Sequence, residues 1–580
     1  MVCTRFRNGA YFFDRDGHLD FAGGICYNEK EKSVRNRRIS MKLRLPDRYT
    51  IYTENEPGQI TCAYEPDIPL EDIRLSVTEN GDALTLRITA DTTPLKYIRL
   101  RWNFTDSEKR SDSFRILGDD YERGYSNLRW AGIEPERTMP WYMLVSNGSD
   151  RNYDVNGRFT EGFGVRVQCS AIVTWQYDGA GITMWADIRN GGSGVLLGGR
   201  TLDVCDIVFG EYRDMTAFDA GRAFCRLMCP TTKTADHKVY GSNNWYYAYG
   251  NSSHDEIHAD TKIVADQCAG LENIPYMVID DGWQKHNCDA PWTETNERFP
   301  DMKKLADEMR AAGVRPGIWI RYLIDGHNEI AEAKPEWRLE KEPACLDPSH
   351  PEVIDYVKRI TKMLREWGYD LIKHDYSTRD VFGQYGNSMR QQMTKDGWHF
   401  YDRSRTSAEI IVDFYQAVRD AAGDDCVIIG CNTISHLCAG MYELNRTGDD
   451  TSGFDWSRTR CMGVNTLAFR LIQNGIFYMA DADCVGITGA IPWKLNRLWL
   501  DVLAKSGSPL FVSCKPGVLN DDELAELKAA WAINSVQTNE ARPLDWMENE
   551  YPELWLIDGE EIRYNWYEDD GITSFNPNRK

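Results

Sequence analysis

The chain has 580 residues and a formal net charge of −22, with 42% hydrophobic and 27% charged residues. At roughly 150 residues per domain this length predicts about two to four domains, and the composition is that of a globular chain rather than a disordered one. The negative charge disfavours nucleic acid and anionic membranes as partners, while a neutral substrate is compatible with it.

The sixteen cysteines are scattered and include no Cys-x-x-Cys pair. We therefore expect reduced, buried thiols. The segment from Met1 to Gly9 has no apolar signal core, and no apolar run approaches the roughly 18 residues that span a bilayer. These features favour a cytoplasmic protein without a membrane partner.

The N-terminal part of the chain has the pattern of short β-strands. Runs such as Leu84–Thr89 and Tyr97–Trp102 alternate apolar and polar residues, and turn signals such as Asn80-Gly81 separate them. Strands at this density predict a β-sandwich over residues 1–225. At its end, Thr216–Leu227 has the pattern of a linking helix.

From residue 226 to 524, apolar strand candidates alternate with helical stretches such as Met302–Ala312 and Ile354–Trp367. This alternation predicts a parallel sheet with crossover helices, and eight units close into a (β/α)8 TIM barrel. The eight strands are expected at Val239–Trp245, Tyr276–Asp281, Arg315–Ile320, Leu371–Asp375, Val427–Cys431, Tyr442–Arg446, Ile476–Ala480 and Pro509–Ser513.

The last part of the chain, residues 525–580, is expected to be a small C-terminal β region. Glu553–Gly559 and Ile562–Tyr567 have the alternation of a hairpin. The chain therefore predicts a multidomain protein with a sandwich, a barrel and a short terminal sheet.

Acids and aromatic residues gather at the ends of the predicted barrel strands, where barrel enzymes carry their chemistry. These ends read Asn243-Asn244-Trp245, Asp280-Asp281-Gly282-Trp283, Trp319, Lys373-His374-Asp375, Cys431-Asn432, Arg446 with Asp449 and Asp450, and Asp481 with Asp483. Two carboxylates delivered into one pocket are the minimum needed to cleave a glycosidic bond. A metal-dependent hydrolase is disfavoured, because only 10 histidines occur and no strand carries a His-x-His pair.

The motifs Asp280-Asp281-Gly282-Trp283-Gln284, Lys373-His374-Asp375 and Arg446-Thr447-Gly448-Asp449-Asp450 occur in the order seen in a known group of enzymes. Residues 239–515 resemble glycoside hydrolase clan D, and most closely the α-galactosidases of family 36. The resemblance implies a retaining, exo-acting α-galactosidase without cofactor or metal. It also implies an oligosaccharide or glycoconjugate substrate and allows a homo-oligomer.

The resemblance implies that Asp375 is the nucleophile and that Asp450, rather than its neighbour Asp449, is the general acid/base. In a retaining mechanism their carboxyl groups lie roughly 5–5.5 Å apart. Lys373 shares a strand face with Asp375, so we expect it to favour the ionised nucleophile, whereas His374 faces the other way into packed side chains. Asp450 has to keep its proton, so we expect its pKa to be raised.

The residues implied to bind substrate are Asp280, Asp281, Trp283, Lys373, Arg446, Trp245, Trp319, Cys431 and Asn432. The two aspartates would accept hydrogen bonds from the sugar's O4 and O6, and the tryptophans would form apolar walls. The segment after Cys431 lacks the glycines of the family, and Asn432 or Thr433 could bond a 2-hydroxyl or a 2-acetamido group. An α-N-acetylgalactosaminidase, a transglycosylase and a non-catalytic sugar-binding protein therefore stay open as alternatives.

Overall fold

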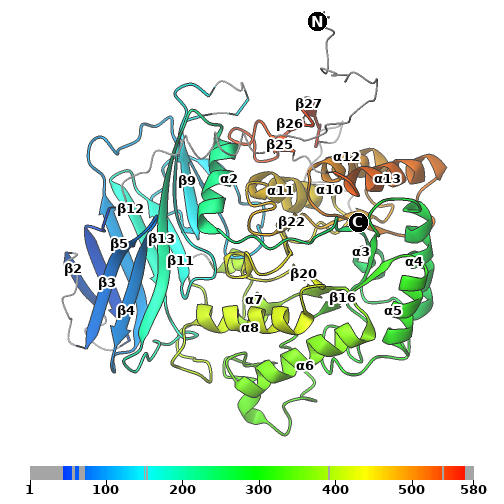
Figure 1. Ribbon diagram of the computed structural model, residues 1–580, viewed down its shortest axis with the longest axis horizontal. Coiled ribbons are helices and arrows are strands. Elements are labelled where there is room, and N and C mark those ends of the chain that lie inside the picture. The colour runs from blue at the N-terminus through cyan, green and yellow to red at the C-terminus, as the bar shows by residue number, and fades with distance from the viewer. Residues whose placement is uncertain are drawn as a thin grey trace, which may run out of the picture.

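A computed structural model of the chain describes residues 44–54, 59–63, 72–148, 150–151, 155–389, 392–537 and 541–567. Two antiparallel sheets form one end of the molecule, and a parallel sheet surrounded by helices forms the other (Figure 1). Residues 1–43 of the expected sandwich and 568–580 of the expected terminal region lie outside the described residues. Within the described ranges, no helix combines the length and apolarity needed to cross a membrane.

The N-terminal domain consists of two antiparallel sheets packed face to face. The first has the order β2-β1-β5-β12-β11-β8, with bounds Gln59–Ala63, Arg48–Thr53, Leu95–Asn103, Gly181–Asp187, Ile172–Tyr177 and Met139–Pro140. The second has the order β3-β4-β13-β10-β9-β6-β7, with bounds Ile73–Asn80, Ala83–Ala90, Thr201–Arg213, Phe159–Val165, Tyr142–Ser146, Arg115–Gly118 and Trp130–Ala131. Trp102 and Trp175 of the first sheet pack on Phe209 of the second, with ring centroids 5.6 and 6.4 Å apart. The described residues thus form the expected sandwich.

Helix α2, Ala217–Met228, follows the sandwich and confirms the expected linking helix. The Thr216 side chain caps it by accepting a hydrogen bond from the Asp219 amide. Its Phe224 packs on Gly162 of β10, where a Cβ would lie 2.6 Å from the Phe224 ring. Glycine at this position therefore lets the helix approach the sheet closely.

The central sheet has nine parallel strands in the order β22-β21-β20-β19-β16-β15-β14-β24-β23. In chain order their bounds are β14 Tyr240–Asn243, β15 Tyr276–Ile279, β16 Arg315–Ile320, β19 Leu371–His374, β20 Val427–Gly430, β21 Leu444–Arg446, β22 Met479–Asp481, β23 Cys484–Ile487 and β24 Leu510–Cys514. All eight expected strands are present; the seventh begins three residues later than expected. Their apolar runs are buried because helices cover one face and side chains fill the other.

The ninth strand, β23, was not expected and is the second half of a broken strand. Only Ala482 and Asp483 separate it from β22, and Asp483 has a left-handed φ of 72°. The first half pairs with β21 and the second half with β24. This broken strand joins the two ends of the sheet, which is the arrangement of a (β/α)8 barrel.

Helices surround the parallel sheet (Figure 1). The longer ones are α4 His254–Gln267, α5 Met302–Ala311, α6 Pro351–Trp367, α8 Ser407–Ala422, α12 Trp493–Lys505 and α13 Asp521–Asn534. Short elements are α3 Trp245–Ala248, η1 Pro335–Trp337, β17 Arg338–Leu339, β18 Glu342–Leu346, α7 Ser377–Phe382, η2 Gly386–Ser388, α9 Ser435–Cys438, α10 Trp456–Arg458, η3 Thr459–Val464 and α11 Asn465–Arg470. The expected helices near 302–312 and 354–367 are both confirmed.

Helix α13 corrects the expected domain boundary. A boundary at residue 524 falls inside this helix, and the chain just after 525 is helical rather than β. Asn520 and Glu523 form a capping box that starts the helix. The helix packs on α12, so it belongs with the barrel.

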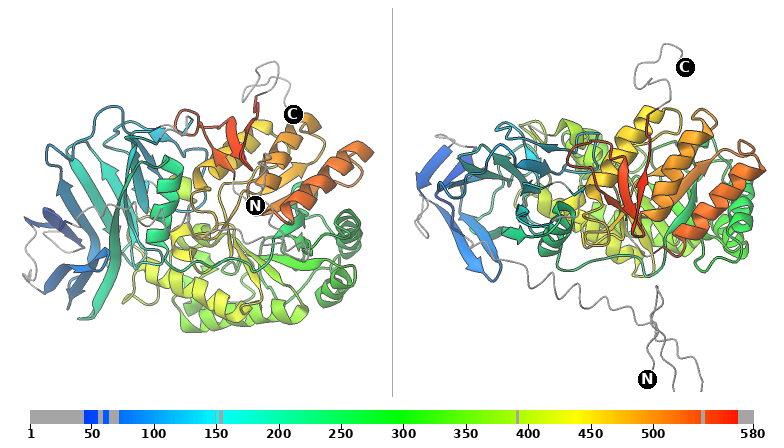
Figure 2. Two further views of the ribbon diagram at one scale, coloured as in Figure 1. Left: turned by 45° about the horizontal axis from the view of Figure 1, so that its top comes forward. Right: turned by 90° about the horizontal axis from the view of Figure 1, so that it is seen from above.

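The C-terminal β region is a three-stranded antiparallel sheet of β25 Arg542–Pro543, β26 Leu554–Ile557 and β27 Glu560–Arg563. It contains the expected hairpin, although the second strand starts two residues earlier than expected. In the loop between β25 and β26, Trp546 packs on Trp130 of the sandwich and on Phe218 of α2, with ring centroids 5.2 and 5.9 Å apart. Figure 2 shows this sheet, in red, near the boundary between sandwich and barrel.

Candidate active site

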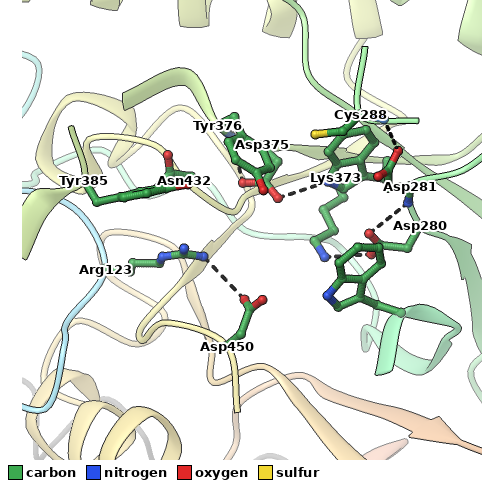
Figure 3. A pocket seen from close by; sticks show the side chains of 12 residues that line it. Arg123, Asp280, Asp281, Cys288, Lys373, Asp375, Tyr376, Tyr385, Asn432 and Asp450 are labelled. Carbon is green, nitrogen blue, oxygen red and sulfur yellow. Dashed lines mark hydrogen bonds and ion pairs between the residues drawn. The ribbon is translucent and has the colours of Figure 1, made fainter. Parts of the chain in front are cut away.

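A cavity of about 420 Å³ lies at the carboxyl ends of the parallel strands and is open to solvent. The residues that line it are Arg123, Trp245, Asp280, Asp281, Cys288, Trp319, Lys373, Asp375, Tyr376, Tyr385, Asn432 and Asp450 (Figure 3). All but Arg123 come from the barrel part of the chain.

Eight of the eleven residues predicted from sequence line this cavity: Asp375, Asp450, Asp280, Asp281, Lys373, Trp245, Trp319 and Asn432. The carboxyl groups of Asp375 and Asp450 point into the same space from opposite sides (Figure 3). Asp449, the rival of Asp450, is not on the cavity wall and pairs with Arg123 and Arg458 at 2.7 Å each.

Asp375 follows β19 directly and is held by two hydrogen bonds. Its Oδ2 accepts from Trp319 Nε1 at 3.0 Å, and its Oδ1 accepts from the Tyr376 amide at 2.7 Å. Tyr376 has a left-handed φ of 63°, a conformation that is strained for a bulky residue. The Arg321 guanidinium lies 4.3 Å from the Tyr376 ring centroid and helps to hold this turn. The two donors fix the orientation of the Asp375 carboxyl group.

Lys373 forms an ion pair with Asp280. Its Nζ lies 2.7 Å from Asp280 Oδ2, and the same oxygen accepts from Asn243 Nδ2 at 2.7 Å. Burial alone would lower the pKa of Lys373, but the Asp280 carboxylate outweighs burial and raises the pKa well above its ordinary value. Lys373 is therefore a cation at ordinary pH, and its side chain lines the cavity.

His374 between them faces away from the cavity, as expected. It is fully buried, and its ring packs against Tyr322 and Phe414 with centroids 5.1 and 5.2 Å apart. Burial lowers the pKa of His374 to about 3, so this side chain is neutral at ordinary pH.

Asp281 lies at the end of β15 beside Cys288. Its Oδ1 accepts from the Cys288 amide at 2.8 Å and from the Gln284 amide group. Burial raises the pKa of Asp281 despite these bonds. The Asp281 amide donates to Asp280 Oδ1 at 3.0 Å and helps to hold the Asp280 carboxyl group in place.

Asp450 corrects the expectation of a raised pKa. Burial alone would raise it, but the guanidinium groups of Arg446 and Arg123 and the ammonium of Lys373 outweigh burial and lower the pKa of Asp450 to about 2. Arg446 Nη2 and Arg123 Nη1 lie 3.3 and 3.6 Å from Asp450 Oδ1. Its side chain is 38% exposed and faces the cavity. In the unliganded cavity Asp450 is therefore a carboxylate.

Three predicted residues lie behind the cavity wall instead of on it. Trp283 is fully buried and donates from Nε1 to the Trp319 carbonyl at 3.0 Å, so it supports Trp319. Arg446, 2% exposed, pairs with Asp483 at 3.0 Å as well as with Asp450. Cys431, also 2% exposed, accepts from Arg446 Nη1 at 3.5 Å. Burial raises the pKa of Cys431 well above its ordinary value, which keeps it a thiol.

Asn432 reaches the cavity, whereas Thr433 does not. Asn432 donates from Nδ2 to Glu122 Oε2 at 2.7 Å. Thr433 is buried and donates to Asn445 Oδ1 at 2.7 Å. Of the two residues considered for a contact at the sugar's 2-position, only Asn432 has access.

The sandwich supplies part of this site through the loop between β6 and β7. Glu122 is fully buried and accepts from Asn432 and, at 2.9 Å, from the Gly386 amide beside Tyr385. The Gly124 amide donates to the Thr447 carbonyl at 2.7 Å, and the Gly124 carbonyl accepts from the Asp449 amide at 3.1 Å. This backbone pairing fixes the loop that carries Asp450 and places Arg123 beside it.

Sequence reasoning missed Arg123, Cys288, Tyr376 and Tyr385 as cavity residues. Tyr376 directly follows Asp375 and could have been included on that ground. For Arg123 the available signal was the segment from Asp119 to Tyr125, where charged and aromatic residues interrupt the alternation of the sandwich. Cys288 and Tyr385 lie in long loops whose sequence gives no local indication of direction.

No family model matches the chain. The α-galactosidase TtGalA from Thermus thermophilus, in complex with p-nitrophenyl α-D-galactopyranoside, matches with a TM-score of 0.54 at 15% identity, over 84% of this chain and 99% of that one. The family 36 α-galactosidase AgaA from Geobacillus stearothermophilus matches with a TM-score of 0.57 at 12% identity, over 89% and 79%. The galactosidase domain of the α-galactosidase-sucrose kinase AgaSK matches with a TM-score of 0.53 at 15% identity, over 83% and 73%. The chain has the fold of these proteins, which confirms at the level of fold the resemblance noted in its motifs.

Proposed function

We propose that the chain is a retaining α-glycosidase that releases terminal α-linked galactose from oligosaccharides or glycoconjugates. The observation that carries this proposal is the pair of carboxyl groups, Asp375 and Asp450, directed into one cavity at the mouth of the barrel (Figure 3). The shared fold supports it, because solved structures with that fold include α-galactosidases in complex with p-nitrophenyl α-D-galactopyranoside and with stachyose.

In the proposed reaction Asp375 attacks the anomeric carbon while Asp450 donates a proton to the leaving oxygen. The bond from the anomeric carbon to that oxygen breaks, and a covalent glycosyl-enzyme forms. Asp450 then removes a proton from a water molecule, which attacks the anomeric carbon and frees the Asp375 carboxylate. The hydrogen bonds from Trp319 and Tyr376 hold the Asp375 carboxyl group in a fixed orientation for this attack.

The depressed pKa of Asp450 keeps this group ionised, as the second step requires, although it also makes the carboxylate a weaker base. In the first step Asp450 has to be protonated, and the protonated fraction falls as pH rises above its pKa. We therefore expect turnover of substrates with poor leaving groups to decrease with rising pH. Substrates whose leaving group needs no proton should lack this decrease.

Asp280, Asp281 and Lys373 are proposed to bind the sugar hydroxyl groups. A carboxylate that accepts a hydroxyl proton penalises a sugar whose hydroxyl points elsewhere, because the buried acceptor is then left unpaired. The three charged groups lie on the same side of the cavity (Figure 3). Trp245 and Trp319 also line the cavity. This combination fits a neutral monosaccharide unit at the end of a chain.

The test is a substrate panel of α-linked galactosides, N-acetylgalactosaminides and glucosides, with the anomer of the first product followed by NMR. The proposal predicts α-galactose as the first product and activity that EDTA does not reduce. Release of N-acetylgalactosamine alone would assign the alternative glycosidase, and transfer to added sugars would assign a transglycosylase. Binding of galactosides without turnover of any α-glycoside would contradict an enzymatic role.

A further inference from the structure

Three aromatic side chains form a continuous surface that leads out of the cavity, and we call it the aromatic platform. Trp245 lines the cavity, and its ring centroid lies 5.0 Å from that of Tyr249. The Tyr249 ring lies 5.9 Å from that of Phe454. Tyr249 is 42% exposed and Phe454 is 51% exposed. Exposed large apolar side chains next to a cavity are a mark of a binding surface.

Hydrogen bonds and close packing hold the backbone that carries the exposed rings of Tyr249 and Phe454. Tyr249 ends helix α3, where its amide donates to the Trp245 carbonyl at 2.8 Å. Before Phe454, Gly453 lies against Gly486 so closely that a Cβ at Gly453 would be 2.8 Å from the Gly486 Cα. The Gly453 carbonyl also accepts from Thr488 Oγ1 at 2.7 Å. A surface that is rigid before a ligand arrives loses little entropy on binding.

The platform lies on the side of the cavity that carries Asp450. Phe454 follows Asp450 by four residues in the same loop, and the Tyr249 hydroxyl contacts the Ser452 carbonyl at 3.5 Å. In a glycosidase the general acid stands next to the leaving oxygen. The part of the substrate that departs therefore leaves the cavity past Asp450, over these rings.

We propose that the aromatic platform binds the leaving part of the substrate, and that this part is a neutral sugar ring rather than a small aglycone. The inference rests on the function proposed above. Sugar rings have apolar C–H faces that fit the flat faces of Tyr249 and Phe454. Three rings offer far less area than the roughly 1,000 Å² that a stable protein interface buries. A second copy of the chain therefore fits the aromatic platform less well than a sugar ring does.

The test compares two substrates in single-residue variants. A trisaccharide with α-galactose at its non-reducing end reaches the platform, whereas α-galactosyl fluoride has a leaving group too small to touch it. We expect Tyr249→Ala and Phe454→Ala each to lower kcat/KM for the trisaccharide by about tenfold. Both should leave kcat/KM for the fluoride unchanged. Tyr249→Phe and Phe454→Tyr should retain trisaccharide turnover because the flat ring is kept.

Tyr401→Ala is the matched control, because Tyr401 is 59% exposed and lies outside the cavity wall. Unchanged trisaccharide turnover in both alanine variants would overturn the proposal. So would equal losses on both substrates, or a change of oligomeric state in the variants, which would assign the rings to an interface.

Failure of the glycosidase proposal would appear separately, as wild-type protein that hydrolyses neither substrate. In that case, calorimetric binding of the trisaccharide that weakens about tenfold in Phe454→Ala would still support the platform. Absence of binding to the wild type would overturn it.

Discussion

Replacing Arg123 with glutamine should raise the pKa of Asp450 and shift the pH dependence of catalysis. Arg123 Nη1 lies 3.6 Å from Asp450 Oδ1, and its Nη2 lies 2.7 Å from Asp449 Oδ1. At an effective dielectric constant of about 20, a charge pair at 3.6 Å is worth roughly 4–5 kcal/mol before screening. Asp449 shares the guanidinium and cavity water screens the pair, so we expect a rise of about one pKa unit, or about 1.4 kcal/mol.

The proposed first step needs protonated Asp450, so kcat/KM should rise when the protonated fraction of Asp450 rises. At pH values well above the pKa of Asp450, a rise of one pKa unit makes the protonated fraction about ten times larger. Protonated Asp450 is then also a weaker acid, and its slower proton transfer cancels roughly half of that gain on a logarithmic scale. Arg123→Gln should therefore raise kcat/KM for an alkyl α-galactoside by about threefold between pH 5 and pH 7. It should leave kcat/KM for α-galactosyl fluoride unchanged.

The assay is a pH profile of kcat/KM for both substrates, with two comparison variants. Arg123→Lys keeps the charge and should keep the wild-type profile. Arg458→Gln removes a cation that also pairs with Asp449 at 2.7 Å but contacts Asp450 only at its backbone carbonyl. This variant should change the profile less than Arg123→Gln does. Equal losses on both substrates at every pH would refute the electrostatic reasoning and assign Arg123 to substrate binding or to structure.

Three further substitutions test the site. Asp375→Asn should lower turnover by several orders of magnitude with an unchanged thermal unfolding midpoint, and a small effect would contradict its assignment as nucleophile. Asp450→Asn should slow alkyl galactosides far more than the fluoride, and similar losses on both would argue against an acid role. Gly448→Ala should lower the free energy of unfolding by about 1–3 kcal/mol in denaturant titration, because the new Cβ would lie 1.9 Å from the Met462 carbonyl oxygen. Gly132→Ala, which meets open space, is its control, and equal stability of the two variants would contradict the close approach of the Met462 carbonyl to Gly448.

Barrel strands such as Tyr276–Ile279 and Val427–Gly430 could be predicted from sequence because they are short apolar runs that are fully buried. The second half of the broken strand could not, because the left-handed turn at Asp483 interrupts the run without a glycine or proline to mark it. Helix α13 was missed because alanines on several of its faces leave no clear apolar stripe. Its capping residues, Asn520 and Glu523, were the signal that could have located it.

The candidate site was predictable where it depends on strand ends and not where it depends on distant contacts. Asp375 and Asp280 follow their strands directly, so the barrel topology alone brings them to the cavity. The pKa of Asp450 is lowered first by Arg446, four residues earlier, and then by Arg123, which lies more than 300 positions earlier in the chain. The contribution of Arg446 could have been predicted from the sequence, whereas no local pattern indicates that Arg123 reaches the cavity.

The backbone pairing of Gly124 with Thr447 and Asp449 makes the sandwich a structural part of the proposed catalytic site. A barrel without the sandwich would lose the pairing at Gly124 that holds the loop carrying Asp450. It would also lose Arg123, one of the cations beside Asp450. Replacing the sandwich by that of a relative, in evolution or in the laboratory, would therefore also change the pKa of Asp450.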